Sequence, residues 1–341
     1  MRNAGHACPI PVLGCLRTLV LAAVVITASP IAASAQTSSL EELVSAVVRI
    51  KTFIAPDGRS VSNLGREREG SGIVIDESGL VLTIGYLMVE AHAAEVITNA
   101  GRTIPANVVG YDHETGFGLL RAIEPLKLKP LAFGKSADVK ANDRALVASF
   151  GGTAMVAPVH VVAKREFAGS WEYLLNEAFF TSPPHPAWSG AALISRDGKL
   201  VGVGSLIVGN AAGGTQSMPG NIFVPIDALF PILGDLLAEG RVSGPAKPWL
   251  GVNADEIGGR LLVSRVTPES PAEKSGLRRG DVIVGVGGEP TKTLPEFYRK
   301  MWARGAAGVI MPLDVLQRGE TRRLDIPSAN RLDHLRLKST F

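Results

Sequence analysis

The sequence predicts a mostly β chain that folds as two successive domains. The chain has 341 residues, which is enough for two domains of about 100–200 residues each. Short apolar runs alternate with Gly, Asp and Asn turn residues from about residue 41 to residue 236, a pattern typical of an all-β sandwich or a pair of barrels. The chain is 46% hydrophobic and contains 38 Gly and 22 Pro, which favours short strands and tight turns around buried cores.

The first 35 residues have the three parts of a secretory signal peptide. Arg2 and Arg17 supply positive charge, the apolar run 18–29 follows, and Ala33–Ala35 offers a small-residue cleavage site. The apolar run has 12 residues, whereas a membrane span needs about 20. We therefore expect residues 1–35 to be a signal peptide and the protein to be exported to the periplasm or another extracytoplasmic compartment. An uncleaved membrane anchor is the alternative.

Cysteine content and charge exclude several kinds of site in the rest of the chain. Cys8 and Cys15 are the two cysteines of the sequence, so the exported part would contain no disulfide, thiol nucleophile or Cys-ligated metal. Arg2 and Arg17 account for two of the 35 Lys and Arg, which leaves 33 against all 32 Asp and Glu after residue 35. This near-neutral charge argues against nucleic acid or an anionic membrane as the main partner. The histidines lack a metal-binding spacing, so we expect neither a metal nor another cofactor.

The elements of the first domain follow one another as strands and then a helix. The segment 225–239 has apolar residues at helical spacing, which predicts a helix there. The expected strands include 46–50, 71–75, 79–83, 144–149, 159–163, 191–195 and 199–206.

A segment rich in Pro and Gly, residues 240–248, marks the boundary between the domains. We expect the first domain at 36–240, a linker at 241–248 and the second domain at 249–327. Residues 328–341 would form a C-terminal tail that is basic and loose from about Asn330.

The second domain resembles a PDZ domain of the HtrA type. Its segment Trp249–Val252 is similar to the family's carboxylate-binding loop, residues 270–283 resemble the short helix, turn and strand that follow, and 294–302 reads as the groove helix. The resemblance implies that a peptide adds a strand to the sheet edge while loop amides hold its terminal carboxylate. The candidate peptide-binding residues are Trp249, Leu250, Gly251, Val252, Phe297, Tyr298 and Met301, although each apolar one is also a candidate for the domain core.

The first domain resembles the protease domain of HtrA/DegP serine proteases at three separated segments. Residues 69–83 are similar to the family's G-S-G strand pair, 198–203 to the strands after the nucleophile, and 221–227 to the end of the domain. The resemblance implies a chymotrypsin-like double β-barrel followed by one PDZ domain. It also implies a homo-oligomer, commonly a trimer.

The resemblance places the catalytic triad at positions where two of its three groups are missing. Ser189, within Ala187–Leu193, occupies the nucleophile position, but Tyr86 stands where the family has His and Gly116 where it has Asp. A phenol is a poor base at neutral pH, and glycine cannot orient a base. Ala187 and Ser189 are the oxyanion-hole candidates, and Ala187 replaces a family glycine there.

Another histidine could in principle replace the missing base. The five candidates are His92, His113, His160, His185 and His334. A surface or loop position is the alternative reading for each of them.

Three functions are therefore open. The first is a pseudoprotease that binds polypeptides, such as unfolded segments or peptide C-termini, in protein quality control, alone or with active relatives. The second is an active serine endopeptidase that uses Ser189 with an atypical base. The third is an adaptor or scaffold that works through the PDZ groove.

Overall fold

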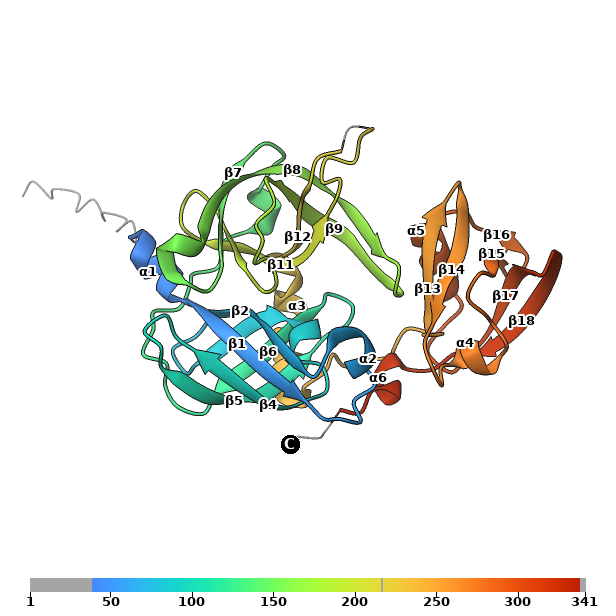
Figure 1. Cartoon of the computed structure of the whole chain (residues 1–341), viewed down its shortest axis with the longest axis horizontal. Coiled ribbons are helices and arrows are strands. Elements are labelled where there is room, and N and C mark those ends of the chain that lie inside the picture. The colour runs from blue at the N-terminus through green and yellow to red at the C-terminus, as the bar shows by residue number, and fades with distance from the viewer. Residues whose placement is uncertain (1–38, 216, 338–341) are drawn as a thin grey trace, which may run out of the picture. The chain divides into compact units, whose positions relative to one another are not determined.

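The fold contains two closed β-barrels followed by a six-stranded sheet (Figure 1). It is seen in a computed structural model that describes residues 39–215 and 217–337. The mostly β class is confirmed, and of the two arrangements left open for the first domain the chain adopts the pair of barrels. These described residues belong to one structural unit. The expected signal peptide lies outside the described residues.

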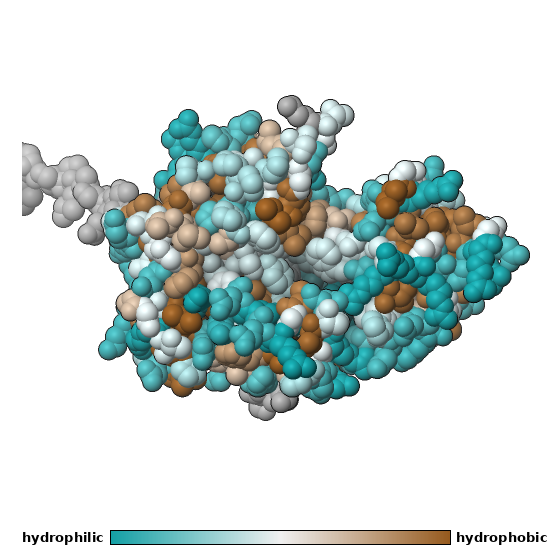
Figure 2. All heavy atoms as spheres, in the orientation of Figure 1, coloured by the Kyte–Doolittle hydropathy of each residue, from teal (hydrophilic) through white to brown (hydrophobic). Residues whose placement is uncertain are grey.

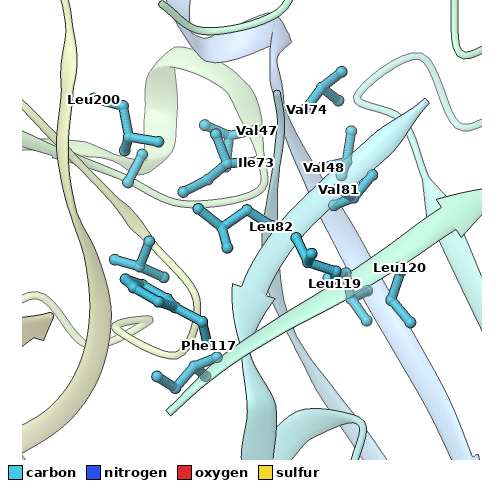
Figure 3. Packing of buried hydrophobic residues seen from close by; sticks show 14 of the residues in the cluster. Val47, Val48, Ile73, Val74, Val81, Leu82, Phe117, Leu119, Leu120 and Leu200 are labelled. Atoms are coloured by element: carbon cyan, nitrogen blue, oxygen red, sulfur yellow. The ribbon is translucent and has the colours of Figure 1, made fainter. Parts of the chain in front are cut away.

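The first barrel closes in the strand order β1-β2-β3-β6-β5-β4. Apolar side chains from one face of these paired strands, such as Val48, Val81 and Leu120, are withdrawn from solvent and belong to the same core cluster (Figure 3). The strands are β1 (Val47–Ile54), β2 (Glu67–Val74), β3 (Leu80–Ile84), β4 (Ala91–Ile97), β5 (Thr103–Tyr111) and β6 (Phe117–Ala122).

The second barrel closes in the order β10-β11-β12-β9-β8-β7. Its longest strands, β8 and β9, continue as a paired hairpin out to Gly169 and Tyr173 (Figure 1). This hairpin ends in the turn 170–172. The strands are β7 (Arg144–Ala148), β8 (Val156–Gly169), β9 (Tyr173–Ser182), β10 (Ala192–Ile194), β11 (Leu200–Val208) and β12 (Gly220–Pro225).

The helix expected at 225–239 is present in two pieces. A 3-10 turn covers Ile226–Ala228, and α3 covers Phe230–Glu239. Gly240 ends α3 in a left-handed conformation, with its N–H bonded to Leu236 O at 3.1 Å. Two short helices precede it, α1 (Leu40–Ser45) and α2 (Val61–Leu64).

The six-stranded sheet has the order β13-β14-β15-β17-β18, with β16 paired to β15. The helix expected at 294–302 is α5 (Leu294–Trp302), which is capped by Thr293. Because β13 pairs on one side with β14, its other side is a sheet edge. The elements are β13 (Val252–Ile257), β14 (Arg260–Val266), α4 (Pro271–Lys274), β15 (Val282–Val286), β16 (Glu289–Pro290), β17 (Ile310–Gln317) and β18 (Glu320–Pro327).

The prediction that the chain is loose from about Asn330 is wrong for residues 331–337. This segment contains α6 (Arg331–His334). Arg331 Nη1 donates to Trp171 O at 3.2 Å, and the Arg336 backbone N–H donates to Glu90 Oε1 at 2.7 Å. These polar contacts hold the basic segment against the protein, and a composition argument does not detect them.

The surface carries hydrophobic residues in small separate groups among hydrophilic ones (Figure 2). Among the exposed large apolar side chains, Ile207 lies on β11, Ile310 on β17 and Ile123 directly after β6. Among the helices of residues 39–215 and 217–337, none is long and apolar enough to cross a bilayer.

Candidate functional site

Tyr86 lies on a 3-10 turn, Gly85–Leu87, directly after strand β3. The turn is held from two sides, because Gly85 N donates to Gly116 O at 2.6 Å and Arg68 Nη1 donates to Tyr86 O at 2.8 Å. Arg68 is 5% exposed. Burial lowers its pKa to about 10, although the nearby Glu90 carboxylate opposes that change. A buried guanidinium therefore positions the turn that presents Tyr86.

Ser189 lies in the loop between β9 and β10, where both barrels hold its backbone. Ser71 N, on β2 of the first barrel, donates to Ser189 O at 2.8 Å. Gly190 N donates to Gly204 O, on β11 of the second barrel, at 2.9 Å. The Ser189 hydroxyl is consequently held at the junction of the two barrels.

The structure brings Tyr86 and Ser189 together. The Tyr86 hydroxyl oxygen lies 2.8 Å from Ser189 Oγ and 2.8 Å from the Ser205 carbonyl oxygen. A phenol has one proton and a carbonyl oxygen only accepts, so the Tyr86 proton belongs in the bond to Ser205 O. The Ser189 hydroxyl then donates to the Tyr86 oxygen. Within the described residues, this phenol is the hydrogen-bond partner of Ser189 Oγ.

The protonation state of Tyr86 makes it unsuitable as a base. Burial raises its pKa to about 12, and hydrogen bonds with Ser189 and Trp188 oppose this change only in part. Tyr86 is thus a neutral phenol at pH 7. A general base must be free to take a proton near the operating pH. Tyr86 accepts the hydrogen bond of the Ser189 hydroxyl, but because it is already protonated it does not activate that hydroxyl.

Tyr173, from the second barrel, fills the space beside Gly116, the position where the resemblance implies a triad acid. Gly116 has φ +84°, a conformation that favours glycine, and a Cβ there would meet Tyr173 Oη at 3.1 Å. Tyr173 in turn donates to Thr115 O at 2.7 Å. The neighbouring Asp112 carboxylate accepts from Thr115 N at 2.8 Å and caps its own turn. No carboxylate in the described residues therefore takes the place of the triad acid.

The amide of Ala187, an oxyanion-hole candidate, is bonded to a histidine. Ala187 N donates to His185 Nδ1 at 3.1 Å. His185 is itself held, because its backbone N donates to Asn221 Oδ1 at 2.6 Å and its ring bonds the Met155 backbone. Burial lowers the pKa of His185, so the ring is neutral at pH 7 and can accept the Ala187 proton. An oxyanion would have to compete with this imidazole for the amide.

The other histidines do not serve Ser189 in this structure. His92 and His160 lie on β4 and β8 with exposed side chains. His334 bonds Arg59 through Nδ1 at 2.9 Å, and burial lowers the pKa of His113 beside Arg331. Among the described residues there is no group of three or more His, Cys, Asp or Glu side chains placed to hold a metal ion.

A cavity of about 520 Å³ lies beside the Tyr86 and Ser189 pair. Its volume is within the range of about 300–1,000 Å³ that ligand pockets occupy. Trp188, the residue directly before Ser189 in the chain, lines this cavity. Its aromatic lining residues are Tyr86, Tyr111, Trp171, Tyr173, Trp188 and Trp249, and its Arg and His lining residues are Arg59, His113, Arg265, Arg331 and His334.

The candidate peptide-binding side chains of the second domain lie mostly in its core. Leu250, Phe297 and Met301 are each 0% exposed, and Tyr298 is 1% exposed. Trp249, Gly251 and Val252 also line the cavity. A Cβ at Gly251, which has φ +86°, would meet Ser270 Cβ at 2.3 Å, so the loop geometry requires glycine there.

Sequence reasoning missed three residues that shape this site. Arg68 and Tyr173 carry no motif, and His185 was considered only as a base, not as an acceptor for Ala187 N. An Arg within a strand and a Tyr at the start of a strand have no distinctive local pattern. Their roles arise from contacts between distant segments.

Comparison with known families agrees with this geometry. A trypsin-like peptidase domain model matches residues 70–203, and a PDZ domain model matches residues 262–311. A protein of Pseudomonas putida (strain W619), named "Probable periplasmic serine endoprotease DegP-like", is 28% identical over 287 residues, which cover 76% of this chain. A protein of the same name from Marinomonas sp. (strain MWYL1) is 30% identical over 240 residues, or 66% of this chain. The chain thus contains a trypsin-like peptidase domain and a PDZ domain, and it is similar to HtrA/DegP-like proteins.

The similarity to these relatives covers about half of each of them. This HtrA/DegP-like chain spans 56% of the P. putida protein and 49% of the Marinomonas protein, about half the length of each relative. A solved structure of an HtrA-type protease, AlgW with a decapeptide, has a TM-score of 0.50 and 22% identity, covering 88% of this chain and 100% of that one. That structure supports the shared fold.

Proposed function

We propose that this HtrA/DegP-like protein is an exported pseudoprotease that binds polypeptides in protein quality control. The observation that carries the proposal is the state of Ser189, whose hydroxyl is bonded to a neutral phenol 2.8 Å away. A serine hydroxyl without a base to take its proton is a weak nucleophile. In a serine protease, losing the base alone costs on the order of 10⁶ in turnover.

The oxyanion-hole candidate Ala187 gives a second, independent reason to propose that the protein is a pseudoprotease. Ala187 N is bonded to His185 Nδ1 at 3.1 Å. Removing one oxyanion-hole donor costs roughly 10²–10³ in kcat. Both the nucleophile and the stabilisation of its intermediate are therefore impaired.

Other features support peptide binding. The PDZ fold offers the β13 edge and a loop with amides at Leu250, Gly251 and Val252, which suits a peptide with a free C-terminus. The names of the relatives and the expected signal peptide support a periplasmic or other extracytoplasmic site of action. Assembly as a homo-oligomer, or with active relatives, is part of the proposal.

The test combines a covalent probe with a binding assay. We expect a fluorophosphonate probe to leave the purified protein unlabelled under conditions that label trypsin completely, while the protein binds denatured casein without cleaving it. Ser189→Ala and the partly exposed Ser195→Ala serve as matched variants. Labelling or casein cleavage that Ser189→Ala abolishes and Ser195→Ala preserves would refute the pseudoprotease proposal and favour the endopeptidase.

The adaptor alternative has its own discriminating measurement. Casein binding is measured after deletion of residues 249–327. This measurement separates a polypeptide holder that uses the barrels from an adaptor that uses only the PDZ domain. Retained binding supports a holder function shared with the barrels, whereas complete loss favours an adaptor that acts through the PDZ domain alone.

A further inference from the structure

The carboxylate-binding loop of the PDZ domain holds a carboxylate from the same chain. Glu172, in the turn of the β8–β9 hairpin (Figure 1), accepts hydrogen bonds from three successive backbone amides. Gly251 N and Val252 N donate to its Oε1 at 2.6 and 2.7 Å, and Leu250 N donates to its Oε2 at 3.0 Å. These are the donors that a peptide's terminal carboxylate would need.

The hairpin turn also occupies part of the adjoining sheet edge. Ala254 N, on the edge strand β13, donates to Ser170 O at 2.9 Å. Tyr298, on α5, donates through its hydroxyl to Gly169 O at 2.6 Å and accepts from Glu172 N at 3.1 Å. The turn therefore contacts the loop, the edge strand and the groove helix, which are the three elements that bind a peptide in this type of domain.

Two features of Glu172 indicate that this contact is built into the fold. Its φ is +57°, in the left-handed region that glycine tolerates best, yet the residue is a glutamate. Its side chain is also nearly withdrawn from solvent, at 6% exposure. A buried carboxylate is costly unless it is hydrogen-bonded, and the three amides supply those bonds.

We infer that the β8–β9 turn is an internal ligand of the PDZ groove and that a polypeptide with a free C-terminus must displace Glu172 to bind. This inference rests on the proposed peptide-binding function and adds its regulation. Because one set of amides cannot hold two carboxylates, internal and external ligands exclude each other. An external peptide can bind only those molecules in which the groove is open. The tethered carboxylate therefore multiplies the apparent affinity for every external peptide by the fraction of open molecules.

The first experiment examines the internal contact without any peptide. Amide hydrogen exchange at Leu250, Gly251 and Val252 is measured in the full chain without its first 35 residues. We expect these amides to be protected in the parent protein and to exchange at least about tenfold faster in Glu172→Ala. Glu177→Gln, an exposed carboxylate on the same hairpin, is the matched control and leaves their exchange unchanged. Equal exchange in Glu172→Ala and the parent would overturn the inference.

The second experiment measures competition. Fluorescein-labelled decapeptides that end in Val, Leu or Phe, each with a free or an amidated C-terminus, are titrated by fluorescence anisotropy. We expect Glu172→Ala to bind a free-carboxylate peptide at least about tenfold more tightly than the parent or Glu177→Gln, and the amidated forms to show no such gain. Circular dichroism melting verifies that each variant is folded.

The two readouts separate the inference from the proposed function. Equally tight binding by the parent and Glu172→Ala overturns the internal ligand and leaves peptide binding intact. If no peptide binds any variant, peptide recognition at this groove fails as a function, while the amide exchange still decides whether Glu172 occupies the loop.

Discussion

At Tyr86, a phenol occupies the place where the family resemblance implies an imidazole. An imidazole with an ordinary pKa of about 6.5 can take a proton from serine near neutral pH, whereas a phenol oxygen would first have to ionise. The surroundings of Tyr86 also differ from those of an active triad. Tyr173 fills the space at Gly116, and His185 bonds the Ala187 amide.

Restoring the base alone should therefore not restore proteolysis. We expect Tyr86→His to cleave fluorescent denatured casein no faster than the parent protein, because it lacks an acid to orient the new imidazole and its Ala187 amide is still bonded to His185. Tyr86→Phe, which has no titratable group, is the control. Cleavage by Tyr86→His that disappears in the double variant with Ser189→Ala would contradict this expectation.

At the scale of the elements, the buried carboxylate of Glu90 accepts hydrogen bonds from several backbone amides, one of them in the C-terminal segment 331–337. Glu90 Oε1 accepts from Arg59 N at 3.0 Å and from Arg336 N at 2.7 Å, and Oε2 accepts from Ser60 N at 2.7 Å. Burial alone would raise the Glu90 pKa, but the hydrogen bonds from Ser60, Arg336 and Arg59 together lower it below 4.5.

The docking of residues 331–337 should depend on this carboxylate. A lowered folded-state pKa contributes stability that is present above the ordinary value of 4.5 and is lost as the pH falls through the folded-state pKa. We expect hydrogen exchange in this segment, relative to the intrinsic exchange rate at each pH, to accelerate in that acidic range. Glu90→Gln, which replaces an acceptor with a donor, should accelerate it already at pH 7, consistent with a cost of about 1–3 kcal/mol.

The control for this prediction is Glu95→Gln on the neighbouring strand β4, which we expect to behave as the parent at pH 7. Unchanged exchange of residues 331–337 in Glu90→Gln would show that the contacts of α6, rather than this carboxylate, hold the segment.

At the scale of the whole molecule, the pKa values of the tyrosines depend on how completely the fold buries their side chains. The chain has four tyrosines. Burial raises the pKa of each of them above 10.0, to about 12 for Tyr86, and it is the largest cause for Tyr111, Tyr173 and Tyr298 as well.

The folded protein should consequently show no phenolate absorbance at pH 10. A raised folded-state pKa contributes stability that is fully present below the ordinary value of 10.0 and is lost as the pH rises through the folded-state values. We expect ultraviolet absorbance near 295 nm to stay flat through pH 10 and then to rise together with the loss of circular dichroism. In concentrated guanidinium chloride the same chain should titrate near pH 10. Phenolate at pH 10 in a protein with intact circular dichroism would contradict the burial of these residues.

The class of fold could be predicted because its signals are local. The runs at 46–50, 71–75 and 79–83 coincide with β1, β2 and β3, and the helix expected at 294–302 is α5. Strand alternation, turn glycines and a helix cap each depend on residues a few positions apart. The family resemblance, rather than these local patterns, placed Tyr86 and Ser189 at neighbouring positions of one site, and the two hydroxyl oxygens lie 2.8 Å apart.

The sequence by itself thus determined a mostly β fold of the HtrA type, and its family resemblance predicted the replacement of two triad groups. Only the tertiary structure decided what Ser189, Ala187 and the PDZ loop are bonded to. Tyr86 and Ser189 are 103 positions apart, and Glu172 and Leu250 are 78 positions apart. Hydrogen bonds over such separations depend on how complete barrels and sheets pack, and local composition and periodicity contain no record of that packing.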